Sequence, residues 1–297
     1  MTNRKAEWSG TLLHLLALAA KLEGEGQYNI AKLARAAVEA LTRQAAFKIA
    51  IPSEKDKLVN EIEQAIVALS RLGLNEDILT ALKRGAAAMA EGRLPLINET
   101  PHPYVCRTCG YIVLNAPVEK CPTCGAWPTT FKQFLPVYWL DALDPFAALE
   151  RLRQTPLEVA ALLAGLPEEA LSQPPADGSW AIRNIVSHLR DAQGVLSFRL
   201  SLLLEQEHPL LESKAVFEWA TQEEERPPTT QEILATYLAS RQETIARLES
   251  LPLRDWWRSG QHQEFGPVTL RQQVSYFAAH EMTHLPQIEV LRHQWVG

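Results

Sequence analysis

The fold of the C-terminal half is decided by one stretch, Ser179-Trp-Ala-Ile-Arg-Asn-Ile-Val-Ser-His188-Leu-Arg-Asp191. A three- and four-residue spacing places the apolar side chains of this stretch on one face of an amphipathic helix that faces a hydrophobic core. These side chains are Ile182, Ile185, Val186 and Leu189. His188 lies beside the apolar face, where a lone histidine is usually a boundary residue and not a ligand.

Helical periodicity continues around this stretch in four blocks. The blocks cover residues 146–163, 179–204, 230–251 and 268–293, and segments that contain proline or glycine connect them. We expect Ser179 to cap the second block, and Thr229 or Thr230 to cap the third. Four amphipathic helices of this length pack most simply as an up-down four-helix bundle.

A second histidine motif, His280-Glu281-Met-Thr-His284, lies in the last block. On a helix, two histidines four positions apart share one face, and this spacing suits a single divalent metal. The pattern is typical of zinc peptidases, where the glutamate is the general base and a third ligand follows downstream. Only thirteen residues follow His284, and the extended metzincin positions are held by Gln287 and Val290. The peptidase therefore stays a minor alternative to a site completed from upstream by His188, with one coordination position open.

In combination these motifs resemble the DinB/YfiT-like superfamily of four-helix bundles over about residues 144–294. The resemblance rests on residues 152–171, on Asp177-Gly-Ser-Trp180, on His188-Leu-Arg-Asp191, on Gly266-Pro-Val-Thr-Leu270 and on residues 280–288. It implies that His188, His280 and His284 bind one divalent metal, which would be zinc, nickel or iron. Several members of the superfamily are transferases or isomerases that use a low-molecular-weight thiol, so the resemblance implies such a thiol here.

Two acidic residues lie next to these histidines in the sequence. Asp191 follows His188 by three positions, where it would orient that ligand or accept a proton from bound water; an exposed helix charge explains it equally well. Glu281 points about 100° away from His280 on a helix, so we expect it at the surface. We assign no function to the remaining histidines of this half and its linker, and we expect its tryptophans to be core or groove aromatics. These residues are His102, His208, His262 and His293, and Trp180, Trp219, Trp256 and Trp257.

All four cysteines lie in two Cys-x-x-Cys pairs, Cys106–Cys109 and Cys121–Cys124, which eleven residues separate. Gly110 and Gly125 follow the pairs directly and permit the positive φ that turns backbone N–H groups towards the sulfurs. Four thiolates suit either iron or zinc. The segment from about residue 101 to 135 resembles the rubredoxin-like domain of rubrerythrins. That resemblance implies iron and electron transfer, and a structural zinc site is the alternative.

In the first 98 residues, apolar side chains recur every three or four positions, which predicts four helices between Glu7 and Glu91 with breaks near residues 24–26, 52–53 and 73–75. A rubrerythrin would carry a di-iron centre here, which requires Glu-x-x-His on two helices. The segment contains no such motif, because its only histidine, His14, is preceded three residues earlier by Thr11. We therefore expect a rubrerythrin-like helical bundle that lacks the di-iron ligands.

Composition excludes several classes of protein. The 297 residues are 46% hydrophobic and 22% charged, as in ordinary globular proteins, and a net charge of −6 without a basic stripe argues against nucleic-acid binding. No stretch reaches the roughly 18 uncharged apolar residues of a membrane span. We expect a cytoplasmic protein, because paired metal-binding thiols favour a reducing compartment and a helix explains the apolar run 11–20 without export.

Together these patterns predict a mainly α protein in three parts: a helical bundle over 1–98, a rubredoxin-like four-cysteine metal domain over 99–138 and a DinB-like bundle over 139–297. The favoured function is a metal-dependent transferase or hydrolase acting on a small molecule, whose ion activates a bound thiol or water. The alternative is a non-enzymatic redox, electron-transfer or stress-response protein with a rubredoxin-type iron site. The sequence leaves the oligomeric state open, a homodimer included.

Overall fold

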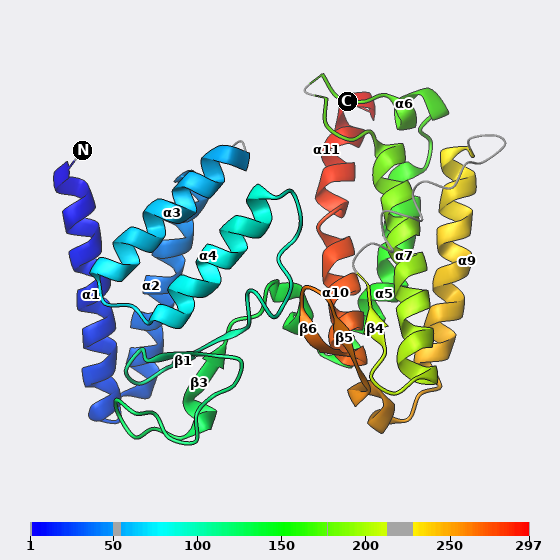
Figure 1. The fold of residues 1–297 in the computed structure, drawn as a ribbon. Helices are drawn as coiled ribbons and strands as arrows, with labels where there is room; N and C mark the ends of the chain where they lie inside the picture. Colours follow the sequence, from blue (N-terminus) through cyan, green and yellow to red (C-terminus); the bar gives the residue numbers. More distant parts are fainter. Residues whose placement is uncertain (1, 50–54, 177, 213–227, 297) are drawn as a thin grey trace. The chain divides into compact units, whose positions relative to one another are not determined.

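The computed structural model describes residues 2–49, 55–176, 178–212 and 228–296, and these ranges are mainly helical (Figure 1). Contacts divide the chain into two compact units, Met1–Leu58 and Val59–Gly297. The division into parts 1–98, 99–138 and 139–297 stays a prediction. No helix among the described residues is long and apolar enough to cross a membrane.

The first unit is a helical hairpin of α1 (Thr2–Gly24) and α2 (Tyr28–Ile49). A short turn joins the helices, and Gly26 adopts the left-handed conformation in it with φ of 73°. Small side chains let the two helices approach closely, since the buried contact consists of Ala19, Ala31 and Ala34.

Two further helices follow: α3 (Lys55–Arg71), which crosses the division at Leu58, and α4 (Glu76–Ala90), which lies in the second unit. Asn75 caps α4, because its side-chain oxygen accepts a hydrogen bond from the Asp77 backbone N–H at 2.7 Å. The four predicted helices before residue 98 are therefore confirmed. The predicted breaks at 24–26 and 73–75 are also confirmed, and the break at 52–53 lies outside the described residues.

A small antiparallel sheet carries the cysteines. Its strands are β1 (Pro103–Cys106), β2 (Ile112–Leu114) and β3 (Phe131–Gln133), in the order β2-β1-β3. The register pairs Val105 with Ile112 and Cys106 with Phe131. This register places the first cysteine at the end of the central strand, where the chain turns.

The segment before this sheet contacts a hairpin of the C-terminal part. The Ile97 backbone N–H donates to the Gln263 carbonyl at 3.0 Å, and His102 Nε2–H donates to the Phe265 carbonyl at 2.8 Å. Gly266 has a φ of 72°, and a side chain there would lie 2.9 Å from Ile97. Only glycine allows both the turn and this close contact.

The C-terminal part is a four-helix bundle, as predicted, but its helices do not simply alternate up and down. The second and third helices both begin beside Glu168, whose carboxylate accepts from Arg183 and Thr230 at their starts, so these two helices run parallel. The four helices are α5 (Pro145–Leu163), α7 (Ile182–Glu205), α9 (Thr230–Glu249) and a fourth formed by α10 (Leu270–Met282) with α11 (Leu285–Val296). Both α5 and α7 pack mainly against α9 and the α10–α11 helix, so α5 and α7 lie across the diagonal of the bundle. The loop between them contains the short α6 (Glu168–Ser172). Apolar side chains of all four helices fill the centre.

Shorter elements cover one end of this bundle (Figure 1). Strands β4 (Leu210–Leu211), β5 (Ser259–His262) and β6 (Gly266–Thr269) form a sheet in that order. Strand β4 pairs parallel to β5, and β6 pairs antiparallel to it. Three short 3-10 helices complete the secondary structure of the described residues, at Pro128–Thr130, Tyr138–Asp141 and Leu253–Trp257.

Two details of the predicted helices are wrong. Ser179 is not the N-cap of α7, because the chain stays extended through Ala181 and the Asn184 side chain accepts from the Ala181 N–H instead. The last block, predicted as one helix, is divided at Thr283 and His284. The N-cap predicted at Thr229 is confirmed, since its hydroxyl accepts from the Glu232 N–H at 3.2 Å.

The cap at Thr229 gives a test of this helix start. Replacing Thr229 by alanine leaves orphan N–H groups in the first turn of α9 and should lower the free energy of unfolding by about 1 kcal/mol. Thr236→Ala is the matched control, because the exposed Thr236 hydroxyl only bonds back to the Glu232 carbonyl within α9. Urea denaturation should show no loss for Thr236→Ala. Equal destabilisation by both substitutions would contradict the cap.

Candidate metal centres

Three histidine side chains from two chain segments meet inside the C-terminal bundle. His188 lies on α7, His280 near the end of α10, and His284 in the turn before α11. The Nε2 atom of His280 is 3.5 Å from that of His188 and 3.3 Å from that of His284. One ligand atom from each of the three lies within 4.8 Å of the others. The structure therefore brings together the three histidines that the sequence analysis predicted as ligands of one metal ion.

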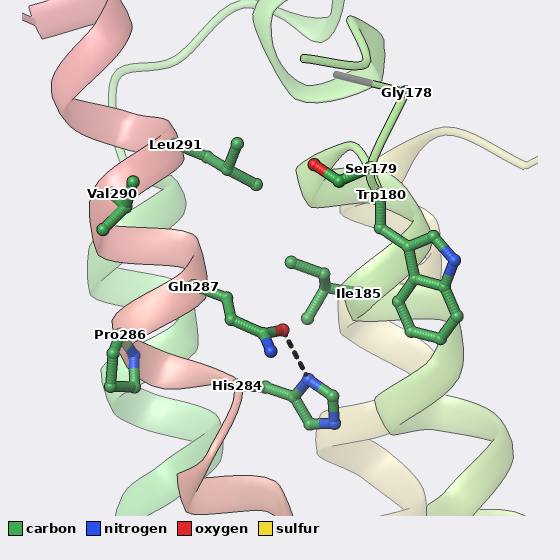
Figure 2. Close-up of a pocket in the computed structure, with 9 residues that line it drawn as sticks. All are labelled: Gly178, Ser179, Trp180, Ile185, His284, Pro286, Gln287, Val290 and Leu291. Carbon is green, nitrogen blue, oxygen red and sulfur yellow. Dashed lines mark hydrogen bonds between the residues drawn. The ribbon is translucent and has the colours of Figure 1, made fainter. Parts of the chain in front are cut away.

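The surroundings of the three rings prepare them to bind a cation. Gln287 Oε1 accepts from His284 Nδ1–H at 2.9 Å, which leaves the lone pair on the Nε2 atom that faces the other two histidines (Figure 2). Burial, followed by the nearby His284 and His188, lowers the pKa of His280 to about 4. Burial and His284 also lower the pKa of His188. Neutral imidazoles at neutral pH are the form that coordinates metals.

Aromatic rings enclose the site on two sides. Trp139 and Tyr276 lie against His280, with ring centroids 5.0 and 5.9 Å away, and Trp180 lies 5.3 Å from His188. The Nδ1 atom of His280 is buried and has no hydrogen-bond partner among the described residues. Three imidazole nitrogens in an apolar, largely enclosed setting fit a divalent metal of the zinc, nickel or iron type.

The break between α10 and α11 follows from Pro286. Proline has no N–H for the Met282 carbonyl, and its ring would collide with that carbonyl in a continuous helix. The turn tightens instead, so that the Thr283 and His284 N–H groups donate to the His280 and Glu281 carbonyls, three residues back. The two histidines thus share one side of the chain at a helix junction and not on a regular helix.

The prediction that Glu281 lies at the surface is wrong, because its side chain is completely buried. Its carboxylate forms an ion pair with Arg241 of α9, whose Nη1 donates at 2.9 Å and whose Nη2 makes a second contact. The Tyr237 hydroxyl donates to the same carboxylate at 3.0 Å. The rotation away from His280 was predicted correctly, but in this bundle it points towards the core.

Arg241 extends this network to all four helices of the bundle. Its Nη1 donates to the Leu152 carbonyl of α5 at 3.0 Å, and its Nε donates to the Gln193 side chain of α7 at 2.5 Å. Gln193 in turn donates to Thr244 of α9 at 2.7 Å. The residue next to His280 is therefore held to α5, α7 and α9 together.

Asp191 lies one helical turn after His188 on α7, but its hydrogen-bond partner is Arg190 and not a histidine. Its carboxylate accepts from the neighbouring Arg190 at 3.0 Å, and its side chain is only 12% exposed. Its negative charge favours protonated His188 but is outweighed by burial and by His284. The structure thus puts Asp191 close enough to act on His188 electrostatically, with Arg190 as its hydrogen-bond partner.

The four cysteines form a second cluster. Sγ atoms pair across the two knuckles, with Cys106 3.7 Å from Cys124 and Cys109 3.5 Å from Cys121. All four sulfurs lie within 4.8 Å of one another, and none is in a disulfide. Sulfurs bound tetrahedrally to one ion at about 2.3 Å would be separated by roughly 3.8 Å, so the cluster fits zinc or iron.

The two cysteine knuckles repeat the same backbone geometry. Gly110 and Gly125 have φ of 81° and 72°, as the sequence predicts, and their N–H groups donate to the carbonyls of Cys106 and Cys121. Burial would raise the pKa of Cys106, but hydrogen bonds from the Cys109 and Thr108 backbone prevail and lower it to about 6. These N–H groups stabilise a thiolate, which is the form that binds metal.

A pocket of about 770 Å³ lies beside the three-histidine site (Figure 2). His284 and Trp180 form the part of its wall next to the histidines, and apolar side chains form most of the rest. The lining residues are Gly178, Ser179, Trp180, Ile185, His284, Pro286, Gln287, Val290 and Leu291. Of the tryptophans expected in a core or groove, Trp180 lines this pocket and Trp256 is buried. Trp257 is exposed, and Trp219 lies outside the described residues.

Comparisons with known proteins find similar families for the C-terminal bundle and for the cysteine segment. Residues 151–288 match the model of the DinB superfamily, and residues 104–132 match the rubredoxin-like domain of rubrerythrin. A protein of Oceanobacillus iheyensis, provisionally named a metal-dependent hydrolase, is 29% identical over 51% of this chain and 82% of its own. A Bacillus cereus protein of the same provisional name is 24% identical over 48% of this chain and 83% of its own.

Among solved structures, one neighbour is similar to half of this chain. YfiT from Bacillus subtilis, described as a probable metal-dependent hydrolase with an unusual four-helix bundle topology, covers 50% of this chain and 86% of its own. It is 21% identical in sequence, with a TM-score of 0.45.

Sequence reasoning missed the residues that hold the histidines in place. Gln287 belongs to the motif that resembles the DinB family and breaks the metzincin pattern, but we assigned it no role, and its side chain bonds His284. Arg241 and Tyr237 carried no signal, because the period of α9 does not reveal that an arginine faces the core. The one hint in the sequence was Glu281 itself: if this acidic residue between His280 and His284 is buried, it needs a cationic partner, which is Arg241.

The buried ion pair gives a stability prediction. Glu281→Leu leaves the Arg241 guanidinium buried without its carboxylate and should lower the free energy of unfolding by about 3–5 kcal/mol. Glu289→Leu, at an exposed position of α11, should change it by less than about 0.5 kcal/mol. The check is chemical denaturation of both variants. Comparable stabilities for Glu281→Leu and the unaltered chain would contradict the role of the pair.

The cysteine cluster gives a second prediction. Cys106→Ser and Cys121→Ser should each remove the ion bound by the four sulfurs, because three thiolates no longer complete a tetrahedral site. Metal analysis of protein purified under reducing conditions should show the loss, while the ion at the histidines is retained. The prediction fails if the unaltered chain carries Cys106–Cys109 and Cys121–Cys124 disulfides and no metal in place of these thiolates.

Proposed function

We propose that this chain, which joins a DinB superfamily domain to a rubredoxin-like domain of the rubrerythrin type, is a metal-dependent hydrolase or transferase acting on a small molecule. The observation that carries the proposal is the convergence of the His188, His280 and His284 Nε2 atoms. The relatives whose names refer to metal-dependent hydrolases support the coarser part of it.

The three histidines would hold the ion, and a neighbouring side chain contacts each of their rings. Gln287 fixes the tautomer of His284, Trp180 lies against His188, and Trp139 lies against His280. A divalent ion held by three imidazoles keeps a coordination position open and supplies a bound water or thiol of lowered pKa as nucleophile. A low-molecular-weight thiol as co-substrate belongs to this proposal through the family resemblance.

Asp191 is the acidic side chain that we assign to proton transfer or ligand orientation. It lies one helical turn after His188, and its charge acts on that histidine. Its carboxylate accepts a hydrogen bond from the neighbouring Arg190 at 3.0 Å. Glu281, the acidic residue between His280 and His284 in the sequence, cannot take this role, because its carboxylate is bound to Arg241 and Tyr237.

The zinc-peptidase alternative does not fit the geometry. A peptidase of the His-Glu-x-x-His type needs its glutamate free to act on a water bound to the metal. Here the Glu281 carboxylate is buried and accepts from Arg241 and Tyr237. A general base committed in this way is not available, so we do not propose peptidase activity.

The four-cysteine cluster supports a second function, electron transfer through an iron ion. Cys109 and Cys124 are exposed, whereas Cys106 and Cys121 are buried. One edge of the cluster is therefore at the surface, where an electron-transfer partner could approach an iron ion. Metal analysis and colour test this role: a red protein that bleaches reversibly on reduction supports it, and a colourless zinc protein contradicts it.

The decisive test of the proposed site is His188→Ala. If the three histidines share one ion, this variant should lose that ion, although His188 is 92 residues from His280 in sequence. Equilibrium dialysis with zinc measures the loss against the ion at the cysteines, which should stay. His293→Ala is the control, because His293 is exposed. His262, to which the sequence analysis also assigned no function, is not a suitable control, because it is only 2% exposed and its replacement would disturb the fold.

Full retention of the ion in His188→Ala would reject the three-histidine assignment. The same result would return the pair His280 and His284, with a ligand from elsewhere, to consideration.

A further inference from the structure

The pocket beside the three histidines has a mainly apolar wall. Its volume of about 770 Å³ is in the range of cavities that bind small molecules. Its polar side chains are those of Ser179, His284 and Gln287, and none of the described residues that line it is an aspartate, glutamate, lysine or arginine. A charged group placed against this wall would lose water without gaining an ion-pair partner. The pocket therefore favours an uncharged ligand.

One wall is the extended segment that precedes α7. Because this helix begins only at Ile182, Trp180 lies outside it, on the chain that leads into the helix (Figure 2). The indole lines the pocket, and its centroid is 5.3 Å from that of the His188 ring. The residue is nonetheless 51% exposed. An indole that contacts a proposed metal ligand and still borders open space offers an apolar surface to a bound molecule.

The opposite wall is one side of α11 (Figure 2). Pro286, Gln287, Val290 and Leu291 line the pocket, and their spacing places them on neighbouring positions of successive turns. Val290 is 62% exposed. Single exposed apolar residues are common, but here several surround one hollow, which is typical of a binding site. The buried Ile185 of the core also lines the pocket, so the hollow extends inward from the surface.

The pocket meets the candidate metal site at both walls. His284 lines the pocket and is one of the three proposed ligands. Gln287 lines it as well and accepts from His284 Nδ1–H at 2.9 Å. On the other wall, Trp180 contacts the ring of His188. A molecule in the pocket is therefore separated from the ion site by no more than one side chain.

We propose that this pocket binds the apolar part of the substrate, which is an uncharged molecule with an aliphatic or aromatic body whose reacting group lies at the ion. This inference rests on the proposed function and names its substrate class. Trp180 and Val290 select the substrate by contact with its apolar body and take no part in the chemical step.

The first experiment measures binding of straight-chain probes to the zinc-loaded full chain by calorimetric titration. Octanamide should bind saturably. Hexanamide should bind about 16-fold more weakly, because each of two lost CH₂ groups contributes about fourfold. Octylammonium, which has the same chain length and a charge, should bind about tenfold more weakly or less well still. No saturable binding of octanamide, or equal binding of octanamide and octylammonium, overturns the proposal.

The second experiment places a charge in the pocket. Val290→Asp should weaken octanamide binding by about tenfold or more. Leu157→Asp is the matched control, because Leu157 is an apolar residue of α5 that is 63% exposed and does not line the pocket. Equal octanamide affinity of these two variants overturns the proposal. So does a dimer of the unaltered chain that Val290→Asp converts into a monomer in sedimentation equilibrium, since the apolar wall is then an interface between copies.

The third experiment tests whether the pocket and the ion act on one molecule. Octanohydroxamate has the same apolar body with a head group that coordinates metal ions, so it should bind the zinc-loaded chain about tenfold more tightly than octanamide. His280→Ala removes a ligand that does not line the pocket, and it should abolish this difference while octanamide still binds. Equal affinity of the unaltered chain for both probes overturns the proposal, because the pocket then does not lead to the ion.

These measurements separate the inference from the proposed function. If the unaltered chain retains zinc at the histidines but binds neither octanamide nor octanohydroxamate, the inference fails and the proposed function stands. If the chain binds octanamide but no ion at the histidines, the proposed function fails and the pocket stands as a site for an uncharged apolar ligand.

Discussion

A carboxylate in the centre of a helical bundle is stable only when a cation and hydrogen-bond donors reach it there. For Glu281 these are the Arg241 guanidinium and the Tyr237 hydroxyl, both from α9. Because Arg241 also bonds the α5 backbone and the α7 side chain of Gln193, the pair fixes the position of α10 against the other three helices. Any displacement of α10 would separate a buried charge from its partners.

The geometry of the histidines depends on this constraint. His280 directly precedes the anchored glutamate, and His284 follows it by three residues in a turn that Pro286 enforces. His188 meets them from α7, the helix that Gln193 ties to the same arginine. The three imidazoles come together because the buried network sets the spacing of α7 and α10. In the usual peptidase reading of this motif the glutamate serves catalysis, whereas here the same position serves the fold.

The two candidate metal centres are built by different means. The cysteine cluster arises from two short turns of identical backbone geometry, held by a three-stranded sheet, so nearly every contact that shapes it is local. The histidine site requires segments 92 residues apart to meet inside a packed bundle. Tight contacts at Gly266 and His102 connect the chain segment before the cysteine sheet to the hairpin that precedes α10.

The sequence alone determined the helices, the cysteine turns and the identity of the three histidines. Periodicity reveals which segments are helical, glycine after a second cysteine reveals a positive φ, and both signals are local. Only the tertiary structure decided that Glu281 faces the core and that Arg241 of another helix is its counterion. One-dimensional periodicity assigns a charged residue to solvent by default, because burying a charge is costly. Whether a partner on another helix offsets that cost depends on how the helices pack, which no stretch of sequence states.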